Sequence, residues 1–136
     1  MGDTGAIPQL GTLTAGTGIT VTNAAHSVTV ASTGTTVKNE TGTTYTFVLT
    51  DAGKHITLTN GAAIAATVPT NASVAFPIGT IISFSQGGAG QVTLSGATPP
   101  TLQSADSALT TVKIYSGGCM IKILTDTWRI FGDMEA

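Results

Sequence analysis

Apolar and polar residues alternate along most of this chain, and a period of two is typical of β-strands that bury one face. The clearest case lies within residues 71–95, where a β-branched and aromatic segment at 80–85 precedes an alternating segment at 91–95. Residues 87–90, between them, include three glycines, which permit a sharp change of direction. We therefore predict a β-hairpin made of 80–85 and 91–95, and we expect the other strands to pack around it.

The same alternation recurs on both sides of this hairpin, with turn residues between the segments. The further expected strands lie within 12–38, 44–50, 55–59, 101–112, 113–116, 119–124 and 128–131. Asn60-Gly61, directly after one of them, is the strongest two-residue hairpin signal in the chain. Because no window longer than one or two turns shows the helical period, we predict an all-β fold. Strand number and spacing favour a β-sandwich or jelly-roll-like domain of short antiparallel strands.

The best candidate for a boundary is the turn at 39–43, with the sequence NETGT. We therefore expect an N-terminal arm and β-hairpin over 1–40 and a β-sandwich knob domain over 41–136. The arm itself, residues 1–11, contains Gly and Pro without periodicity and reads as an extended segment. It is either a frayed terminus or a segment that docks on a partner through its few apolar residues.

Charged residues are unusually rare, at 9% of the chain against about 25% in an average soluble domain. The hydrophobic share is 41% and the net charge is −2, a combination that argues against intrinsic disorder. Two explanations remain: partner chains cover much of the surface, or Thr and Ser hydroxyls keep a β-surface hydrated. We favour the first, because a net charge near zero promotes association.

The same composition argues against several classes of partner. The five basic residues are scattered, whereas a nucleic-acid surface needs them clustered. There is no apolar run of the roughly 18 residues that a membrane span needs, and the first residues lack a signal-peptide pattern. We therefore expect neither nucleic acid nor membrane as a partner. The single cysteine, Cys119, excludes an intrachain disulfide and is expected to be a buried, inert thiol.

No catalytic or metal-binding constellation stands out, so we expect a protein that is not an enzyme and holds no metal or cofactor. The seven acidic residues lie far apart, and His26 and His55 are not at metal-ligand spacing. The glycines of 87–90 precede a strand rather than the helix that a phosphate loop requires. Trp128 and Tyr115 are candidates for a sugar-binding surface, but we expect Trp128 in the core.

Several segments of the chain resemble a small β-domain of bacteriophage virion proteins, which occurs in tail-fibre-like and head-decoration contexts. The segments that carry the resemblance are Tyr45–Leu49, Asp51–Lys54, Phe76–Thr80, Gln86 with Gly88–Thr93, Tyr115-Ser116, and Thr125–Trp128 with Gly132-Asp133. The sequence AGTGITVTN at 15–23 also resembles a short repeat of tail-fibre and virion-surface proteins that winds into intertwined trimeric β-structure. The resemblance implies a trimeric structural protein without catalysis.

We accordingly expect a homotrimeric capsid decoration or cement protein, made in the host cytoplasm, that binds the major capsid protein on the particle surface. The arm and hairpin would anchor or trimerise it. The expected contact residues are Ile7, Pro8, Leu10, Leu13, Ile19 and Val21. The alternative is a tail-fibre knob that recognises a host surface glycan or protein. A glycan-degrading tail spike is a remote third hypothesis, because it would need two carboxylates about 5–10 Å apart, and the sequence offers no adjacent pair.

Overall fold

The computed structural model describes residues 14–16, 19–25, 27–32 and 34–136, and it divides the chain into two units, Met1–Gly34 and Thr35–Ala136. In the first unit, β1 (Ile19–Ala24) and β2 (Ser27–Ser32) form an antiparallel hairpin, as the alternation within 12–38 predicts. All the remaining strands, β3 to β13, lie in the second unit, so the all-β prediction is confirmed.

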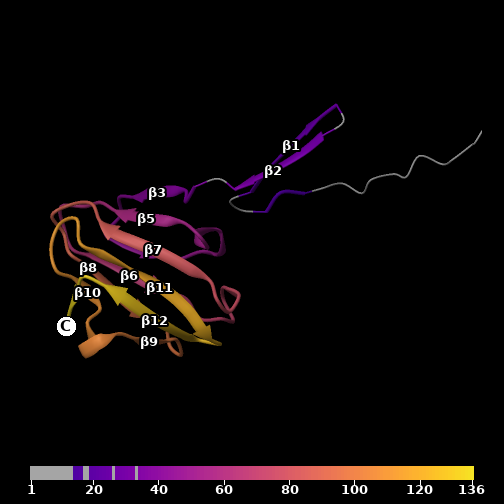
Figure 1. Cartoon of the computed structure of the whole chain (residues 1–136). Helices are drawn as coiled ribbons and strands as arrows, with labels where there is room; N and C mark the ends of the chain where they lie inside the picture. Colours follow the sequence, from indigo (N-terminus) through magenta and orange to yellow (C-terminus); the bar gives the residue numbers. More distant parts are fainter. Residues whose placement is uncertain (1–13, 17–18, 26, 33) are drawn as a thin grey trace, which may run out of the picture. The chain divides into compact units, whose positions relative to one another are not determined.

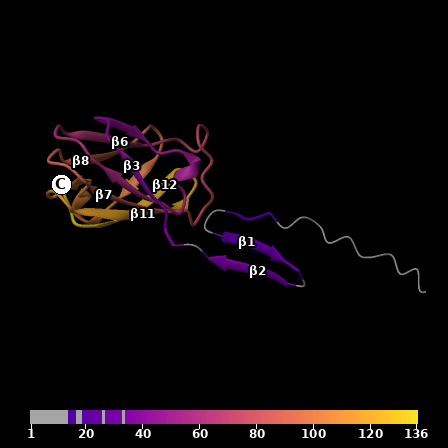
Figure 2. The same ribbon diagram turned by 90° about the horizontal axis from the view of Figure 1, so that it is seen from above.

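Two sheets form the two layers of the second unit (Figures 1 and 2). The six-stranded sheet contains, in spatial order, β3 (Val37–Glu40), β5 (His55–Leu58), β7 (Ile81–Gln86), β11 (Gly117–Leu124), β12 (Thr127–Gly132) and β9 (Thr101–Gln103). The five-stranded sheet contains β13 (Met134–Glu135), β10 (Thr110–Thr111), β8 (Val92–Gly96), β6 (Ile64–Val68) and β4 (Thr44–Thr46). Two 3₁₀ turns, η1 (Leu49–Asp51) and η2 (Ala105–Ser107), lie in the connections.

One hydrophobic core fills the space between the sheets, because alternate residues of the long strands point inward. Its buried members are Phe47, Ile56, Leu58, Ile64, Ala66, Val68, Phe76, Ile82, Phe84, Val92, Leu94, Met120, Trp128 and Ile130. The Trp128 ring packs edge-to-face against Phe76, with the ring centroids 5.3 Å apart. The core position predicted for Trp128 is therefore confirmed, and Trp128 is not part of a sugar-binding surface.

The direction of the strands differs from the prediction. β3, β5 and β7 are parallel neighbours in one sheet, and β4, β6 and β8 are parallel neighbours in the other. The chain therefore passes from sheet to sheet in three successive coils, β3–β4, β5–β6 and β7–β8. Antiparallel pairing joins β11 to β7 and β12, and β10 to β8 and β13. Half of the fold is thus a stack of parallel coils rather than a set of hairpins.

The predicted hairpin of 80–85 and 91–95 is wrong, because β7 and β8 belong to different sheets. The glycines of 87–90 mark a corner that stacks on the corner of the preceding coil. A Cβ on Gly90 would collide with the Ala62 carbonyl oxygen, and a Cβ on Gly88 would collide with that of Asn60. Glycine is needed here for close backbone approach rather than for a hairpin turn.

Asn60-Gly61 likewise joins strands of different sheets, β5 and β6, so this second hairpin signal is also wrong. The Asn60 side chain links the stacked corners: its Nδ2 donates to the Thr41 carbonyl oxygen at 2.6 Å. On the other side, the Gly90 amide donates to the Asn60 carbonyl oxygen at 2.9 Å. Asparagine serves here as a polar link between coils, a use that two-residue turn statistics do not anticipate.

The boundary between the units also differs from the predicted one at 40/41. β3 pairs with β5 in parallel over Val37↔His55 to Glu40↔Leu58, so residues 37–40 belong to the sandwich. The division falls instead between Gly34 and Thr35. The NETGT turn that suggested the boundary is the corner between the first two strands of the sandwich, β3 and β4.

Candidate interaction site

Of the six predicted contact residues, the structure places Ile19 and Val21 on β1, while Ile7, Pro8, Leu10 and Leu13 lie outside the described residues. Val21 faces Val30 across the hairpin, and directly opposed residues share a face. Ile19 is 40% exposed and Val30 is 59% exposed. The hairpin unit therefore carries an aliphatic face that its own two strands leave open to solvent.

A second uncharged surface lies on the outer side of the six-stranded sheet. The row Val37, His55, Ser83, Cys119 and Phe131 crosses five strands as successive Cα partners. Val37 is 64% exposed and Phe131 is 57% exposed, at the two ends of the row. The side chains between them are those of His55, Ser83 and Cys119.

The next row across the same face consists of Ile81, Ile121, Arg129 and Gln103. Ile81 is half exposed, and among the outward-facing residues of these six described strands Arg129 carries the one formal charge. We call Val37, Ile81, Cys119 and Ile121 the apolar face. In the sequence this face is indicated by adjacent apolar residues such as Ile81-Ile82. A strand with only one buried face would instead alternate apolar and polar residues.

The outer side of the five-stranded sheet has a different chemistry. Thr44, Ala65, Thr93 and Thr110 are successive Cα partners, and the row ends at Glu135. Thr93 and Thr110 share a hydrogen bond of 3.1 Å between their hydroxyls. The outer surface of this sheet therefore carries mainly hydroxyl side chains, whereas the outer surface of the six-stranded sheet carries exposed aliphatic side chains such as Val37 and Ile81.

His55 lies within the outer face of the six-stranded sheet and uses both ring nitrogens. Nδ1 is 3.0 Å from Ser83 Oγ and Nε2 is 2.8 Å from Ser85 Oγ. In a Ser–His–Asp site a carboxylate orients the second nitrogen, whereas a second serine occupies that position here. Cys119, beside Ser83, is half buried, and burial raises the pKa of its thiol. The predicted full burial of Cys119 is wrong, because the residue is only partly buried, but a raised pKa keeps the thiol protonated and weakly nucleophilic.

The strongest electrostatic cluster lies at the edge strand β3 and consists of Lys38, Tyr45, Asp51 and Glu40. The buried Asp51 carboxylate accepts hydrogen bonds from the Tyr45 hydroxyl at 2.5 Å and the Val48 amide at 2.9 Å. Lys38 Nζ lies 3.3 Å from Asp51 Oδ1 and 2.9 Å from Glu40 Oε1. The contacts are saturated within the protein, so the cluster is structural rather than a site awaiting a ligand.

Two pKa shifts follow from this cluster. Burial, together with the hydrogen bond to Asp51, raises the pKa of Tyr45 to about 12. Burial by itself lowers the pKa of Lys38, but the hydrogen bonds to Tyr45, Glu40 and Asp51 together raise that pKa above its ordinary value. Both groups are therefore held in their protonated forms in the folded protein.

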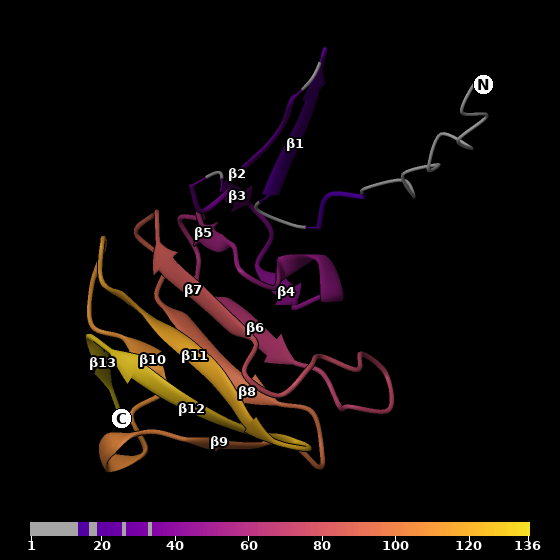
Figure 3. The ribbon, with the colours of Figure 1, turned by 45° about the vertical axis from the view of Figure 1, so that its right-hand side comes forward.

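A pocket of about 670 Å³ lies at the far edge of the six-stranded sheet, where Figure 3 shows β9 and β12 next to the C-terminal strand. β9 pairs with β12 only as far as Gln103↔Arg129, and β12 continues to Gly132. The lining residues are Gln103–Asp106, Ala108, Arg129–Gly132 and Met134–Ala136. No local sequence signal pointed to this site, because four separate elements build it.

Comparison of the chain with protein-family models, with curated proteins and with solved structures gave no match. Within the described residues, no group of three His, Cys, Asp or Glu side chains is placed to hold a metal ion. Among those residues, too, no helix is long and apolar enough to cross a membrane.

Proposed function

We propose that this chain is a non-enzymatic structural protein that assembles with identical copies, as a homotrimer, on the surface of a bacteriophage particle. The particle contact would be with the major capsid protein, which makes the chain a decoration or cement protein of the head. The observation that carries the proposal is the apolar face of Val37, Ile81, Cys119 and Ile121, on a sheet that already has a complete core on its other side.

The apolar face supports association because its side chains are not needed to complete the hydrophobic core of one chain. The residues that alternate with it, such as Ile56, Ile82 and Met120, are fully buried between the sheets. Exposed aliphatic side chains on the opposite side therefore contribute little to the fold of one chain. Interfaces between permanent subunits are more apolar than ordinary surface, and charged residues are depleted at their centres. The outer face of the six-stranded sheet shares the scarcity of charge, since Arg129 carries the one formal charge among the outward-facing residues of its described strands.

The hairpin unit supports the same conclusion independently. An isolated two-stranded hairpin is marginally stable in water, since it cannot bury the face that its apolar residues share. Ile19, Val21 and Val30 form such a face. Association of three hairpins through these residues would bury it, which agrees with the trimeric repeat that residues 15–23 resemble.

Placement on a phage particle rests on the resemblance of the segments within 44–133. The alternative, a tail-fibre knob that recognises a host surface, would use the same assembly at another location. Immunogold labelling of intact particles separates the two: gold over heads supports the decoration role, and gold at tail tips supports the knob. Particles without gold would contradict both.

Light scattering coupled to size-exclusion chromatography tests the assembly. We expect three times the 13.6 kDa of one chain for the native protein. Ile81→Glu places a charge on the apolar face and should weaken the trimer, so that monomer appears on dilution although the hairpin contact is unchanged. The matched control is Thr93→Glu, on the hydroxyl surface of the other sheet, which should leave the trimer intact. A native monomer, or equal dissociation of both variants, would contradict the proposal.

A further inference from the structure

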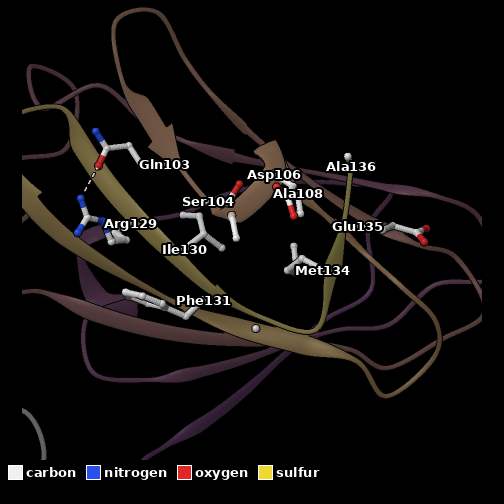
Figure 4. A pocket seen from close by; sticks show the side chains of 12 residues that line it. Gln103, Ser104, Asp106, Ala108, Arg129, Ile130, Phe131, Met134, Glu135 and Ala136 are labelled. Atoms are coloured by element: carbon white, nitrogen blue, oxygen red, sulfur yellow. Dashed lines mark hydrogen bonds between the residues drawn. The ribbon is translucent and has the colours of Figure 1, made fainter.

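The pocket beside β12 has a floor of apolar side chains with one unpaired hydroxyl beneath it. Figure 4 shows Ser104 and Ile130 between the Arg129–Gln103 pair on one side and Asp106, Ala108 and Met134 on the other. Among the described residues, Ser104 Oγ is the one buried side-chain polar atom without a hydrogen-bond partner. Because this oxygen is itself buried, it lies beneath the pocket surface and is not part of the surface that a bound molecule would touch.

The rim of the pocket offers donors and acceptors on opposite sides. Arg129 Nη2 donates to Gln103 Oε1 at 2.9 Å, which orients the guanidinium and the amide and leaves the remaining N–H groups of both for a ligand (Figure 4). Asp106, on the opposite side, is exposed and has a φ of 52°, so its carboxylate is presented from a fixed turn. Groups that both donate and accept, such as alcohols, fit this arrangement best.

An aromatic ring and the charge balance narrow the ligand class. The Phe131 side chain lines the pocket and is 57% exposed, although burial of a Phe ring is favourable. The ring can pack against the C–H face of a pyranose, while the sugar hydroxyls reach the polar rim. Arg129 is the one cation of the lining, and Asp106 and Glu135 are two anions. Phosphate, sulfate and acidic sugars are therefore disfavoured.

An added peptide strand fits the pocket less well. The part of β12 beyond its pairing with β9 spans only residues 130–132. It ends at Gly132, whose φ is 150°, and the next amide, that of Asp133, donates to the Gly117 carbonyl oxygen. Three residues offer too short an edge for a stable ladder, because strands usually run about five or six residues.

We propose that this pocket binds a neutral saccharide, with Phe131 stacking on a pyranose ring and Gln103, Asp106 and Arg129 bonding its hydroxyls. The volume of about 670 Å³ falls within the usual range of about 300 to 1,000 Å³ for small-molecule sites. The site borders the apolar face, because Phe131 and Arg129 are the strand partners of Cys119 and Ile121. The proposal concerns the pocket alone and holds for either location on the particle.

Glycan-array screening of the full chain, followed by titration of the selected neutral sugars by isothermal calorimetry and NMR, tests the proposal. Phe131→Ala should weaken binding about tenfold, and Asp106→Asn should also weaken it while preserving an exposed turn. The matched control is Tyr115→Ala, which removes an aromatic side chain that is 82% exposed elsewhere. Light scattering of each variant should show an unchanged assembly, so that loss of binding is separated from loss of the oligomer.

Three outcomes would overturn the proposal. One is an array without neutral-sugar binding together with unchanged NMR spectra at tens of millimolar monosaccharide. Another is equal weakening by Tyr115→Ala and Phe131→Ala, which would place the contact elsewhere. The third is displacement of pocket signals by a synthetic peptide of residues 1–13 but not by sugars, which would identify the pocket as a peptide site.

Discussion

Thr111 Oγ1 donates a 2.6 Å hydrogen bond to Gln86 Oε1 in the interior of the sandwich, and both side chains are almost completely buried. Thr111 belongs to β10 of one sheet and Gln86 to β7 of the other, so this bond joins the two layers. Thr111 Oγ1 also accepts the Val92 amide at 2.9 Å, and Gln86 Nε2 donates to the Gly88 carbonyl oxygen. Both polar side chains therefore have hydrogen-bond partners, and buried polar groups add stability and specificity only under this condition.

Thr111→Val should therefore destabilise the protein far more than its near-equal volume suggests. The change leaves Gln86 Oε1 and the Val92 amide unpaired in the core, which we expect to cost about 2–4 kcal/mol. Urea unfolding followed by circular dichroism measures the loss. The matched control is Thr110→Val, one residue away on the outer face, for which about 0.5 kcal/mol is expected. Equal losses for the two valine variants would show that the interior bond contributes nothing.

Asp51→Asn tests the ionic cluster. The substitution keeps the size of the side chain but removes the charge that Lys38 and the Tyr45 hydroxyl contact. Because Asp51 is buried but Lys38 is one-third exposed, we expect a loss of roughly 2–3 kcal/mol in chemical unfolding. Glu40→Gln, at the exposed end of the same cluster, should cost less than about 1 kcal/mol. A larger loss of stability for Glu40→Gln than for Asp51→Asn would contradict the conclusion that the buried Asp51 carboxylate is the main stabilising group of the cluster.

The pKa of Tyr45, raised to about 12, predicts a loss of stability in alkali. The folded state favours the neutral phenol, so this contribution is complete below the unfolded pKa of about 10 and disappears as the pH rises towards 12. The raised pKa of Lys38 acts in the same direction. Unfolding midpoints measured between pH 8 and 11.5 should fall above pH 10, and Tyr45→Phe should flatten that decline. An unchanged slope in the Phe variant would exclude the Tyr45 contribution.

Two glycines distinguish stacked corners from hairpin turns. Gly90→Ala places a methyl group against the Ala62 carbonyl oxygen and should destabilise by more than about 2 kcal/mol, or prevent folding. A Cβ at Gly61 would have no atom within 4 Å, and the φ of Gly61 is not positive, so Gly61→Ala should be within about 0.5 kcal/mol of the native protein. In a two-residue hairpin Gly61 would need a positive φ, and its substitution would be costly. Thermal unfolding of both variants decides between the topologies.

Deletion of residues 1–11 tests the arm. If Ile7, Pro8 and Leu10 anchor the protein to the capsid, the truncated chain should bind capsids at lower occupancy and still unfold at the native temperature. Sedimentation with purified capsids measures occupancy, and calorimetry of the free protein measures unfolding. Unchanged occupancy would remove the arm from the anchoring role.

Most strand positions could be predicted from this sequence, but strand partners could not. The predicted strand at 113–116 is wrong, because these residues form a turn, and β6 was not predicted. The alternation around Val92 and Leu94 correctly indicates which side chains are buried. The topology is hidden because corners between stacked coils use the same Asn and Gly residues as hairpin turns. Equivalent positions of the three coils, Val37, His55 and Ser83, are separated by 18 and then 28 residues, so no fixed repeat length reveals the stack.

The candidate sites were equally hard to predict, for a similar reason. The exposure of Ile81 becomes evident only once Ile82 is known to fill the core, since either residue could face inward. The pocket is lined by Ser104 and Asp106 from one part of the chain and by Ile130 and Met134 from another. This arrangement depends on β9 ending after Gln103 and on the left-handed conformation of Asp106, and neither follows from local periodicity.

The first coil, β3–β4, forms one end of the stack of parallel coils. Its strands β3 and β4 are the terminal strands of both sheets on the same side, so one coil leaves both backbone ladders open there. An open sheet edge can pair with a strand of another chain and so serve as a template for fibril growth. Lys38 and Glu40 place an ion pair on the edge strand, and Lys38 is tied to the buried Asp51. A further strand added at this edge would have to desolvate those charges, so the cluster that stabilises one chain also protects it against amyloid-like aggregation.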